Sequence, residues 1–310
     1  MIYELQIATA AEENLLLEEF SQRFCWLRER GYLLGVSRVA NEQSNILFVN
    51  LRLQGNNNDL FLKEDDIIYI FKHQISEFLA EHILHDWEEK ILFKEINKKS
   101  RRISPEDQKI VLYKAVDFLR RCNDNESLNL LLNYGRKNKI SHKIMDYIYS
   151  NNSLVIEGLI NFCLPDYLNE LRFAVDLACE ELRNEKEYND FVKLLRYFVD
   201  TQPPRLHEVN LLMDKDGLFY IWDGDGVNIQ EKFTDYYCND IRINEISLDD
   251  ILVSILITIS PQRIILHNAG KQDTEPVKMI REVFAERIQD CDGCERCLLN
   301  GPDNDWKNRH

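Results

Sequence analysis

The sequence predicts an α+β protein, and three observations carry that prediction. Apolar residues alternate as in strands near the start of the chain, a long stretch from residue 65 to 151 has helical periodicity, and Asp-Gly turns separate short apolar runs near residues 215–226. With 310 residues, of which 45% are hydrophobic, the chain can bury a sizeable core. We divide it into an N-terminal α+β unit (1–62), a helical segment (63–150) and a C-terminal α+β region (151–310).

The first segment reads as β-α-β-β. Ile2–Ile7 alternates like a strand, and Ala11–Arg30 carries apolar residues at helical spacing. Gly31 is placed to end that helix, because glycine adopts the left-handed conformation at helix C-termini without steric cost. Tyr32–Val39 and Ile46–Leu53 then predict a hairpin.

The middle segment predicts four or five helices and is strongly basic. Polar breaks are expected at Lys98–Pro105, Cys122–Glu126 and Gly135–Ile140. Residues 90–143 hold 14 Lys and Arg against 6 Asp and Glu, whereas the whole chain carries a formal charge of −15. The positive charge is therefore concentrated in one segment of an acidic protein.

The third segment begins with SLVIEGLINF, which fits a strand or the approach to a helix. Leu164–Asp200 predicts two helices, or one broken near Asn184, and the two prolines Pro203–Pro204 end the helical part. Within it, Glu185–Asp200 is amphipathic, and its apolar face is expected to pack in the core.

A β-meander is expected next, followed by alternating helices and strands. Asp223-Gly-Asp225-Gly lacks the later acidic ligands of a calcium loop and predicts a hairpin turn. The expected elements are strands at Val209–Met213, Leu218–Trp222, Val227–Ile229 and Arg263–His267, and helices at Leu248–Ser260 and Val277–Glu286.

Three cysteines near the end of the chain form the strongest candidate site. Cys291, Cys294 and Cys297 have C-x2-C-x2-C spacing, which lets a tight loop bring three thiolates around one ion, and Gly293 would ease the turn. A zinc site needs a fourth ligand, for which His267 and Cys238 are the candidates. His267 is favoured because it ends a strand expected near the final segment. An iron–sulfur site is the weaker alternative, since no fourth cysteine follows.

Two other groups of residues suggest function less strongly. His82, His85, Asp86 and Glu89 share one side of a helix, as a metal-dependent hydrolase would require, although a plain His82–Asp86 hydrogen bond explains the pattern as well. The second group is a basic stretch that begins with Lys98, Lys99, Arg101 and Arg102. If these side chains came together into one patch that binds phosphates, they would favour a nucleic-acid-binding regulator.

Other classes of protein are disfavoured. The N-terminus lacks the basic and apolar regions of a secretory signal, and the most apolar window, Ile251–Ile259, is too short to span a membrane. Eight cysteines without an export signal indicate reduced thiols of the cytosol. The common nucleotide-binding and hydrolase motifs are missing, which favours a non-enzymatic role through a protein partner.

Several blocks of the C-terminal half, taken in order, resemble the YtxC family, which is attributed to sporulation in endospore-forming bacteria. The resemblance implies a sporulation-associated protein of the cytosol, and it implies no activity, cofactor or site residue. The matching blocks are IEGLINF (156–162), DYLNEL (166–171), EKEYNDFVKLLRYFV (185–199), SPQRIILH (260–267) and VFAERIQDCDGCERC (283–297).

Overall fold

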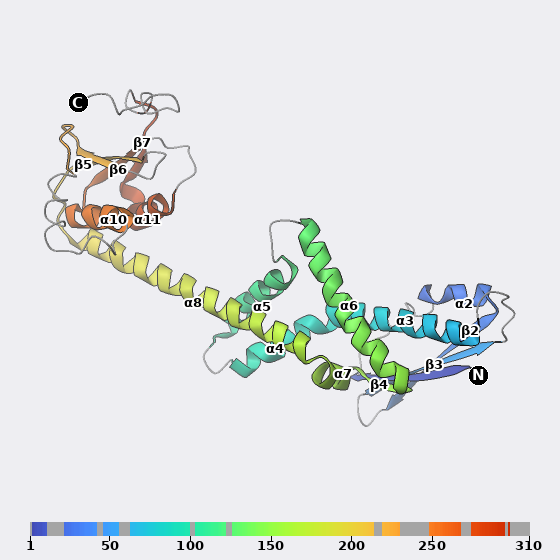
Figure 1. Cartoon of the computed structure of the whole chain (residues 1–310). Helices are drawn as coiled ribbons and strands as arrows, with labels where there is room; N and C mark the ends of the chain where they lie inside the picture. Colours follow the sequence, from blue (N-terminus) through green and yellow to red (C-terminus); the bar gives the residue numbers. More distant parts are fainter. Residues whose placement is uncertain are drawn as a thin grey trace. The chain divides into compact units, whose positions relative to one another are not determined.

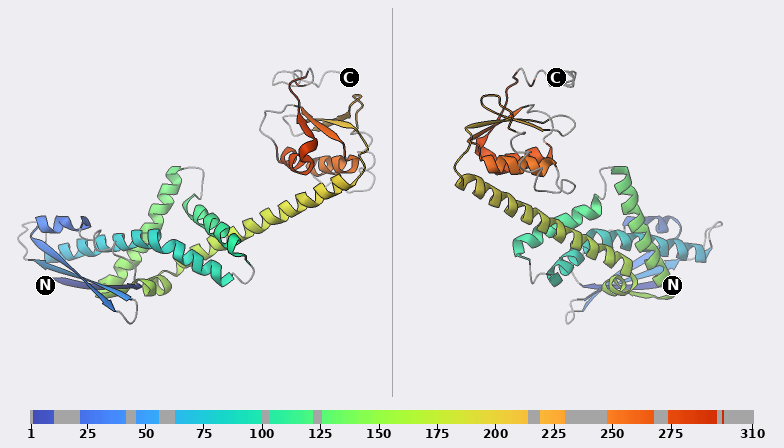
Figure 2. Two further views of the ribbon diagram at one scale, coloured as in Figure 1. Left: turned by 180° about the vertical axis from the view of Figure 1, so that it is seen from behind. Right: turned by 60° about the vertical axis from the view of Figure 1, so that its left-hand side comes forward.

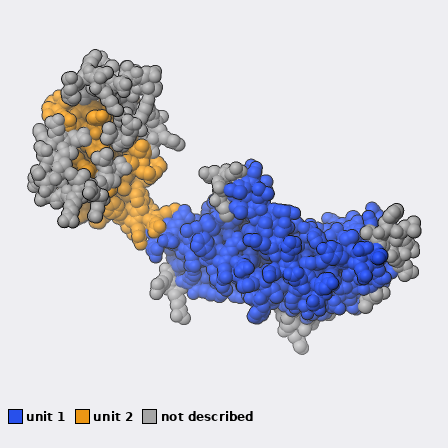
Figure 3. All heavy atoms as spheres, viewed as in Figure 1, with its two compact units in different colours: residues 1–183 blue, residues 184–310 orange. Residues whose placement is uncertain are grey.

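The computed structural model confirms an α+β protein and divides it into two compact units. Unit 1 is Met1–Arg183 and unit 2 is Asn184–His310 (Figure 3). Each unit has its own cluster of buried hydrophobic side chains. The division into three segments (1–62, 63–150, 151–310) stays a prediction. The structure describes residues 2–10, 22–41, 46–55, 63–99, 103–121, 126–213, 219–229, 248–267, 274–294 and 297.

Unit 1 contains a four-stranded sheet in the order β2-β3-β1-β4. The hairpin predicted after Gly31 is present, with Tyr32 of β2 paired to Gly55 of β3, and Gly31 has a φ of +82°. The strands are β1 (Tyr3–Ala10), β2 (Tyr32–Asn41), β3 (Ile46–Gly55) and β4 (Ser153–Val155), and α2 (Cys25–Glu29) precedes β2. Residues 11–21 of the helix expected at Ala11–Arg30 lie outside the described residues.

Helices pack beside the sheet of unit 1; the first of them lies along the sheet, and others extend beyond its end (Figure 1). In the first of them, α3, residues Ile67, Phe71, Ile75 and Leu79 recur every four positions and are fully buried, so one face of this helix enters the core. Phe71 packs edge-on against the ring of Tyr3 in β1. The helices are α3 (Glu64–His82), the π-helical turn η1 (Ile83–Trp87), α4 (Glu88–Lys99), α5 (Pro105–Arg120), α6 (Glu126–Ser150) and α7 (Ile156–Cys163).

The helix break expected at Gly135–Ile140 is wrong, because α6 continues through it. Two ion pairs with neighbouring helices hold this stretch: Arg136 with Glu88, and Lys137 with Glu81. A glycine inside a helix costs only about 1 kcal/mol, which such tertiary contacts outweigh. The breaks expected on either side of α5 are confirmed.

The break expected near Asn184 is also wrong, since α8 (Pro165–Thr201) is continuous and ends just before Pro203. Its amphipathic second half is less buried than the sequence pattern predicts. Val199 is fully buried, but Phe191 and Phe198 are close to half exposed. The small core of unit 2 accommodates only part of this apolar face.

Unit 2 is built on a second sheet, in the order β6-β5-β7-β8, in which β5, β7 and β8 run parallel. The helices α10 and α11 lie on one side of the sheet (Figure 2). The strand β8 was not predicted from the sequence. The elements are β5 (Glu208–Met213), β6 (Phe219–Asp223), α10 (Leu248–Ile259), β7 (Arg263–His267), α11 (Glu275–Phe284), the 3-10 turn η4 (Ala285–Arg287) and β8 (Ile288–Asp290).

The predicted meander is reduced in its third strand to one bridge, between Trp222 and Asn228. The Asp-Gly run is a turn, as expected: Asp223 Oδ1 accepts hydrogen bonds from the backbone N–H groups of Asp225 and Val227, at 3.1 and 2.9 Å. No helix of the described part of the chain has both the length and the apolar character needed to cross a membrane.

Candidate metal centre

The parallel strands of unit 2 bring His267 and the cysteine run to the same edge of the sheet. His267 is the last residue of β7, and Cys291 directly follows β8. The carboxyl ends of parallel strands lie at one edge, so these two residues meet although 23 residues separate them in sequence. The Cys291 N–H donates to Leu266 O at 2.9 Å, which extends the ladder between the two strands.

The four residues predicted as ligands, His267, Cys291, Cys294 and Cys297, form one cluster. Their ligand atoms all lie within 4.8 Å of one another, and all four residues are half-buried. The Sγ atoms of Cys294 and Cys297 are each 3.4 Å from His267 Nδ1 and 3.8 Å from each other. Within the described ranges, no other group of three or more His, Cys, Asp or Glu residues is arranged to hold a metal ion.

These distances fit a tetrahedral zinc ion. With Zn–S bonds of about 2.3 Å and Zn–N bonds of about 2.0–2.1 Å, tetrahedral angles require S···S distances of about 3.8 Å and S···N distances of about 3.6 Å. The Cys294–Cys297 separation matches the first value, and the two Sγ···Nδ1 separations are close to the second. A disulfide is excluded for this pair, because its sulfurs would lie about 2.05 Å apart.

The backbone around the cluster is fixed from two directions. Gly293 has a φ of +108°, a conformation that side chains oppose, and it turns the chain between Cys291 and Cys294. Asp290, the residue before Cys291, forms two hydrogen bonds with the Arg281 guanidinium of α11, at 2.6 and 3.3 Å. The loop that carries the thiols therefore starts from an anchored point.

Two side chains next to His267 were not predicted as part of the site. The Trp222 ring packs against the imidazole, with centroids 5.0 Å apart, and Asn210 Oδ1 lies 3.0 Å from His267 Nε2. The only sequence signal for Asn210 is its position inside a strand, between the apolar residues Val209 and Leu211. The alternative ligand Cys238 lies outside the described residues.

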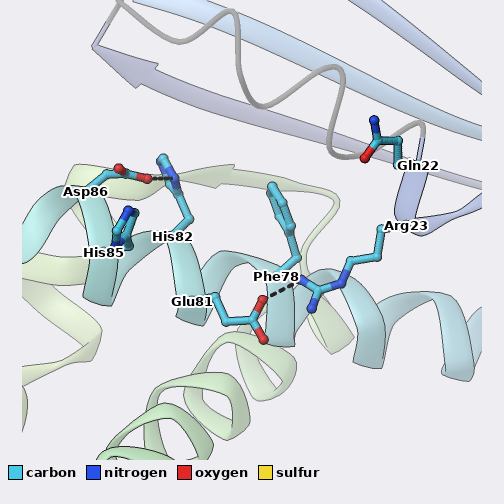
Figure 4. Close-up of a pocket in the computed structure, with 7 residues that line it drawn as sticks. All are labelled: Gln22, Arg23, Phe78, Glu81, His82, His85 and Asp86. Atoms are coloured by element: carbon cyan, nitrogen blue, oxygen red, sulfur yellow. Dashed lines mark ion pairs between the residues drawn. The ribbon is translucent and has the colours of Figure 1, made fainter.

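Three of the four residues considered for a hydrolase, His82, His85 and Asp86, line a pocket of about 540 Å³ in unit 1 (Figure 4). His82 Nδ1 is 2.6 Å from Asp86 Oδ2, which is the plain i,i+4 hydrogen bond that the sequence allowed. Glu89 pairs instead with Arg120, at 3.7 Å. The described residues therefore add no further metal ligand to the group proposed for a metal-dependent hydrolase.

The other acidic side chain of this pocket, Glu81, forms ion pairs with two basic side chains. Burial alone would raise the pKa of the Glu81 carboxyl, but hydrogen bonds and charges from Arg23 and Lys137 outweigh burial and hold that pKa below its ordinary value. Arg23 is 2.7 Å from Glu81 (Figure 4), and Lys137 is 2.8 Å from it. Glu81 therefore acts as the centre of an ion-pair network between helices.

The basic residues proposed for nucleic acid are partly paired with acids of unit 1. Lys98 contacts Glu95 at 2.6 Å, and Lys99 forms an ion pair with Asp176 of α8. Arg101 and Arg102 lie outside the described residues. The nucleic-acid site stays a prediction.

Comparison with known proteins identifies relatives without an assigned activity. A sequence model of the family described as "YtxC-like family" matches residues 73–289, which is more than half of the chain. Over 158 residues the chain is 27% identical to "Uncharacterized protein YtxC" of Bacillus subtilis (strain 168). That alignment covers 51% of this chain and 55% of the relative, so the chain spans about half the length of the curated relative it matches. No solved structure matches.

The part of the chain that the family model matches contains three residues of the candidate site and ends just before the three cysteines. Asn210, Trp222 and His267 lie within residues 73–289, whereas the cysteine run starts at Cys291. A metal is therefore supported by the geometry of this chain rather than by its relatives.

Proposed function

The chain belongs to the YtxC-like family, and on that premise we propose that it is a non-enzymatic, sporulation-associated protein of the cytosol whose unit 2 holds a structural zinc ion. The ligands are His267, Cys291, Cys294 and Cys297. The single observation that carries the metal is the convergence of these four donors within 4.8 Å at one sheet edge.

The donor set favours zinc and a structural role. Three thiolates and an imidazole are soft to borderline ligands, which select zinc over the oxygen-preferring cations. Four protein ligands fill a tetrahedral shell and leave no position for a reacting water, whereas catalytic zinc sites supply three. The ion would join the end of β7 to the tail that follows β8.

The rest of the proposal has other support. The sporulation role follows from the family resemblance of the C-terminal half. A role through contacts with a protein partner is supported by the missing catalytic motifs. The cytosol is supported by the cysteines of the described residues, none of which forms a disulfide.

Elemental analysis of the untagged protein tests the metal. We expect about one equivalent of zinc per chain, and strongly reduced zinc in Cys294→Ser. Cys179→Ser is the matched control, because this half-buried thiol lies on α8 in unit 1 and burial raises its pKa above the ordinary value. Less than about a tenth of an equivalent of zinc or iron in the unaltered protein would overturn the metal site.

Deletion of the gene in its host tests the biological role separately. We expect fewer heat-resistant colonies after sporulation, restored by the unaltered gene but not by the Cys294→Ser gene. Unchanged colony counts on deletion would refute the sporulation role and leave the metal site standing.

A further inference from the structure

Asn210 is a buried polar residue at the centre of the sheet of unit 2. It lies on β5, is 7% exposed, and is paired with Trp222 of β6 and Ile265 of β7. Its neighbours Val209 and Leu211 enter the core beneath α10 and α11, so Asn210 points to the opposite face of the sheet. His267, two residues beyond Ile265 on β7, lies on that same face.

The contacts of Asn210 fix which way its amide group points. The Nδ2 group donates to the Asp223 carbonyl at 3.4 Å and to Glu208 Oε1 at 3.2 Å, and both of these atoms can only accept. The Oδ1 atom therefore faces His267 Nε2, 3.0 Å away. A reversed amide would bring Oδ1 against two acceptors and lose both hydrogen bonds.

This orientation determines the tautomer of His267. Because Oδ1 can only accept, Nε2 must carry the hydrogen. The lone pair of the neutral imidazole is then on Nδ1, the atom that lies 3.4 Å from the sulfurs of Cys294 and Cys297. Trp222 packs against the ring and limits its rotation.

We propose that Asn210 is the positioning residue of the metal centre: it accepts the Nε2–H of His267 and thereby presents Nδ1 to the ion. The inference rests on the proposed zinc site and assigns that site its supporting contact. Histidine ligands commonly donate their second N–H to such a partner, and loss of the partner lowers metal affinity ~10–100-fold.

The test measures zinc affinity by chelator competition and the His267 tautomer by ¹⁵N NMR. In the unaltered, zinc-loaded protein we expect Nε2–H and a metal-bound Nδ1. For Asn210→Leu we expect ~10–100-fold weaker zinc binding and, in the zinc-free protein, a mixture of the two His267 tautomers where the unaltered protein keeps the hydrogen on Nε2. Tyr220→Leu is the control, since Tyr220 of β6 lies on the same face of the sheet as Asn210 and is 44% exposed. The zinc affinity of this variant should not change.

A rescue variant separates positioning from general damage to the fold. The carboxylate introduced by Asn210→Asp would accept the Nε2–H, but its other oxygen would face two acceptors, the Glu208 carboxylate and the Asp223 carbonyl. This substitution is therefore combined with Glu208→Gln, whose amide can donate to the new carboxylate. We expect the double variant to recover part of the affinity, because the Asp223 carbonyl still faces a carboxylate oxygen, and Glu208→Gln alone to retain the affinity.

The outcomes distinguish the inference from the function on which it rests. An unaltered protein that binds no zinc refutes both. Zinc binding with Nε2 as the coordinating atom refutes the role of Asn210 alone, and this measurement does not require Asn210→Leu to fold. Equal zinc affinity and an unchanged tautomer in a folded Asn210→Leu protein would refute it as well.

Discussion

Glu88 and Arg136 form an ion pair inside unit 1. Glu88 is 3% exposed, and its carboxylate contacts both the Arg136 guanidinium and the Tyr167 hydroxyl, the latter at 3.2 Å. Burial, and then the Glu88 charge, raise the pKa of Tyr167, so this hydroxyl stays protonated as a donor. Glu170 also contacts Arg136, at 2.8 Å. The network joins α4, α6 and α8.

Removal of the cation alone should destabilise unit 1 strongly. Arg136→Met leaves the buried Glu88 carboxylate without its counter-charge, and we expect a loss of ~3–5 kcal/mol in the free energy of unfolding. Urea unfolding followed by circular dichroism measures it.

The double variant Glu88→Leu with Arg136→Met provides the comparison. It has no uncompensated charge, so it should be more stable than Arg136→Met alone. Equal or lower stability of the double variant would contradict the buried-charge explanation.

Among the elements, α6 shows how tertiary contacts override a local signal. A Cβ atom added at Gly135 would meet no atom within 4 Å, and the residue does not have a positive φ. The glycine therefore weakens the helix without serving a turn. Gly31, in contrast, has a φ of +82° and requires glycine.

The two glycines should respond in opposite directions to the same substitution. We expect Gly135→Ala to raise the stability of unit 1 by about 0.5–1 kcal/mol, because alanine loses less backbone entropy in a helix. Gly31→Ala should lower it, because alanine is strained at positive φ. The free energy of unfolding in urea measures both effects, and destabilisation by Gly135→Ala would show a packing role that the structure lacks.

The sequence predicted elements best where one local pattern determined them. The β1 strand, the hairpin after Gly31 and the end of α8 before Pro203 follow from alternation, glycine conformation and proline. The continuity of α6 and α8 depends on contacts between distant residues, so periodicity did not reveal it. The three-residue strand β8 is too short to give a pattern, and it exists because β7 lies beside it.

The candidate site divides in the same way. The spacing of Cys291, Cys294 and Cys297 is visible in the sequence, and His267 was selected because it ends a strand. Asn210 could not be recognised, since its role depends on the pairing of β5 with β7 and on the hydrogen bonds of one amide group.

At the scale of the whole molecule, the two hydrophobic cores share no residue, and the proposed ion belongs to unit 2 alone. A ligand that binds only a folded state stabilises that state by mass action. Metal should therefore stabilise one unit and leave the other unchanged.

Thermal unfolding with and without a zinc chelator checks this expectation. We expect two unfolding transitions, one for each unit. The chelator should lower only the midpoint temperature of unit 2, and Arg136→Met only that of unit 1. Cys294→Ser should reproduce the chelator effect in the presence of zinc. A single transition, or equal shifts of both, would contradict energetic independence of the two units.

The shortness of β8 has a consequence for the protein without its ion. This strand forms the border of its sheet with only three residues, and the thiol-bearing loop begins where it ends. If the loop were released, β8 would be free to fray and would uncover the N–H and C=O groups of β7. An exposed, largely apolar border strand is a template for pairing with other chains, so chelation should promote self-association, and added zinc should suppress it.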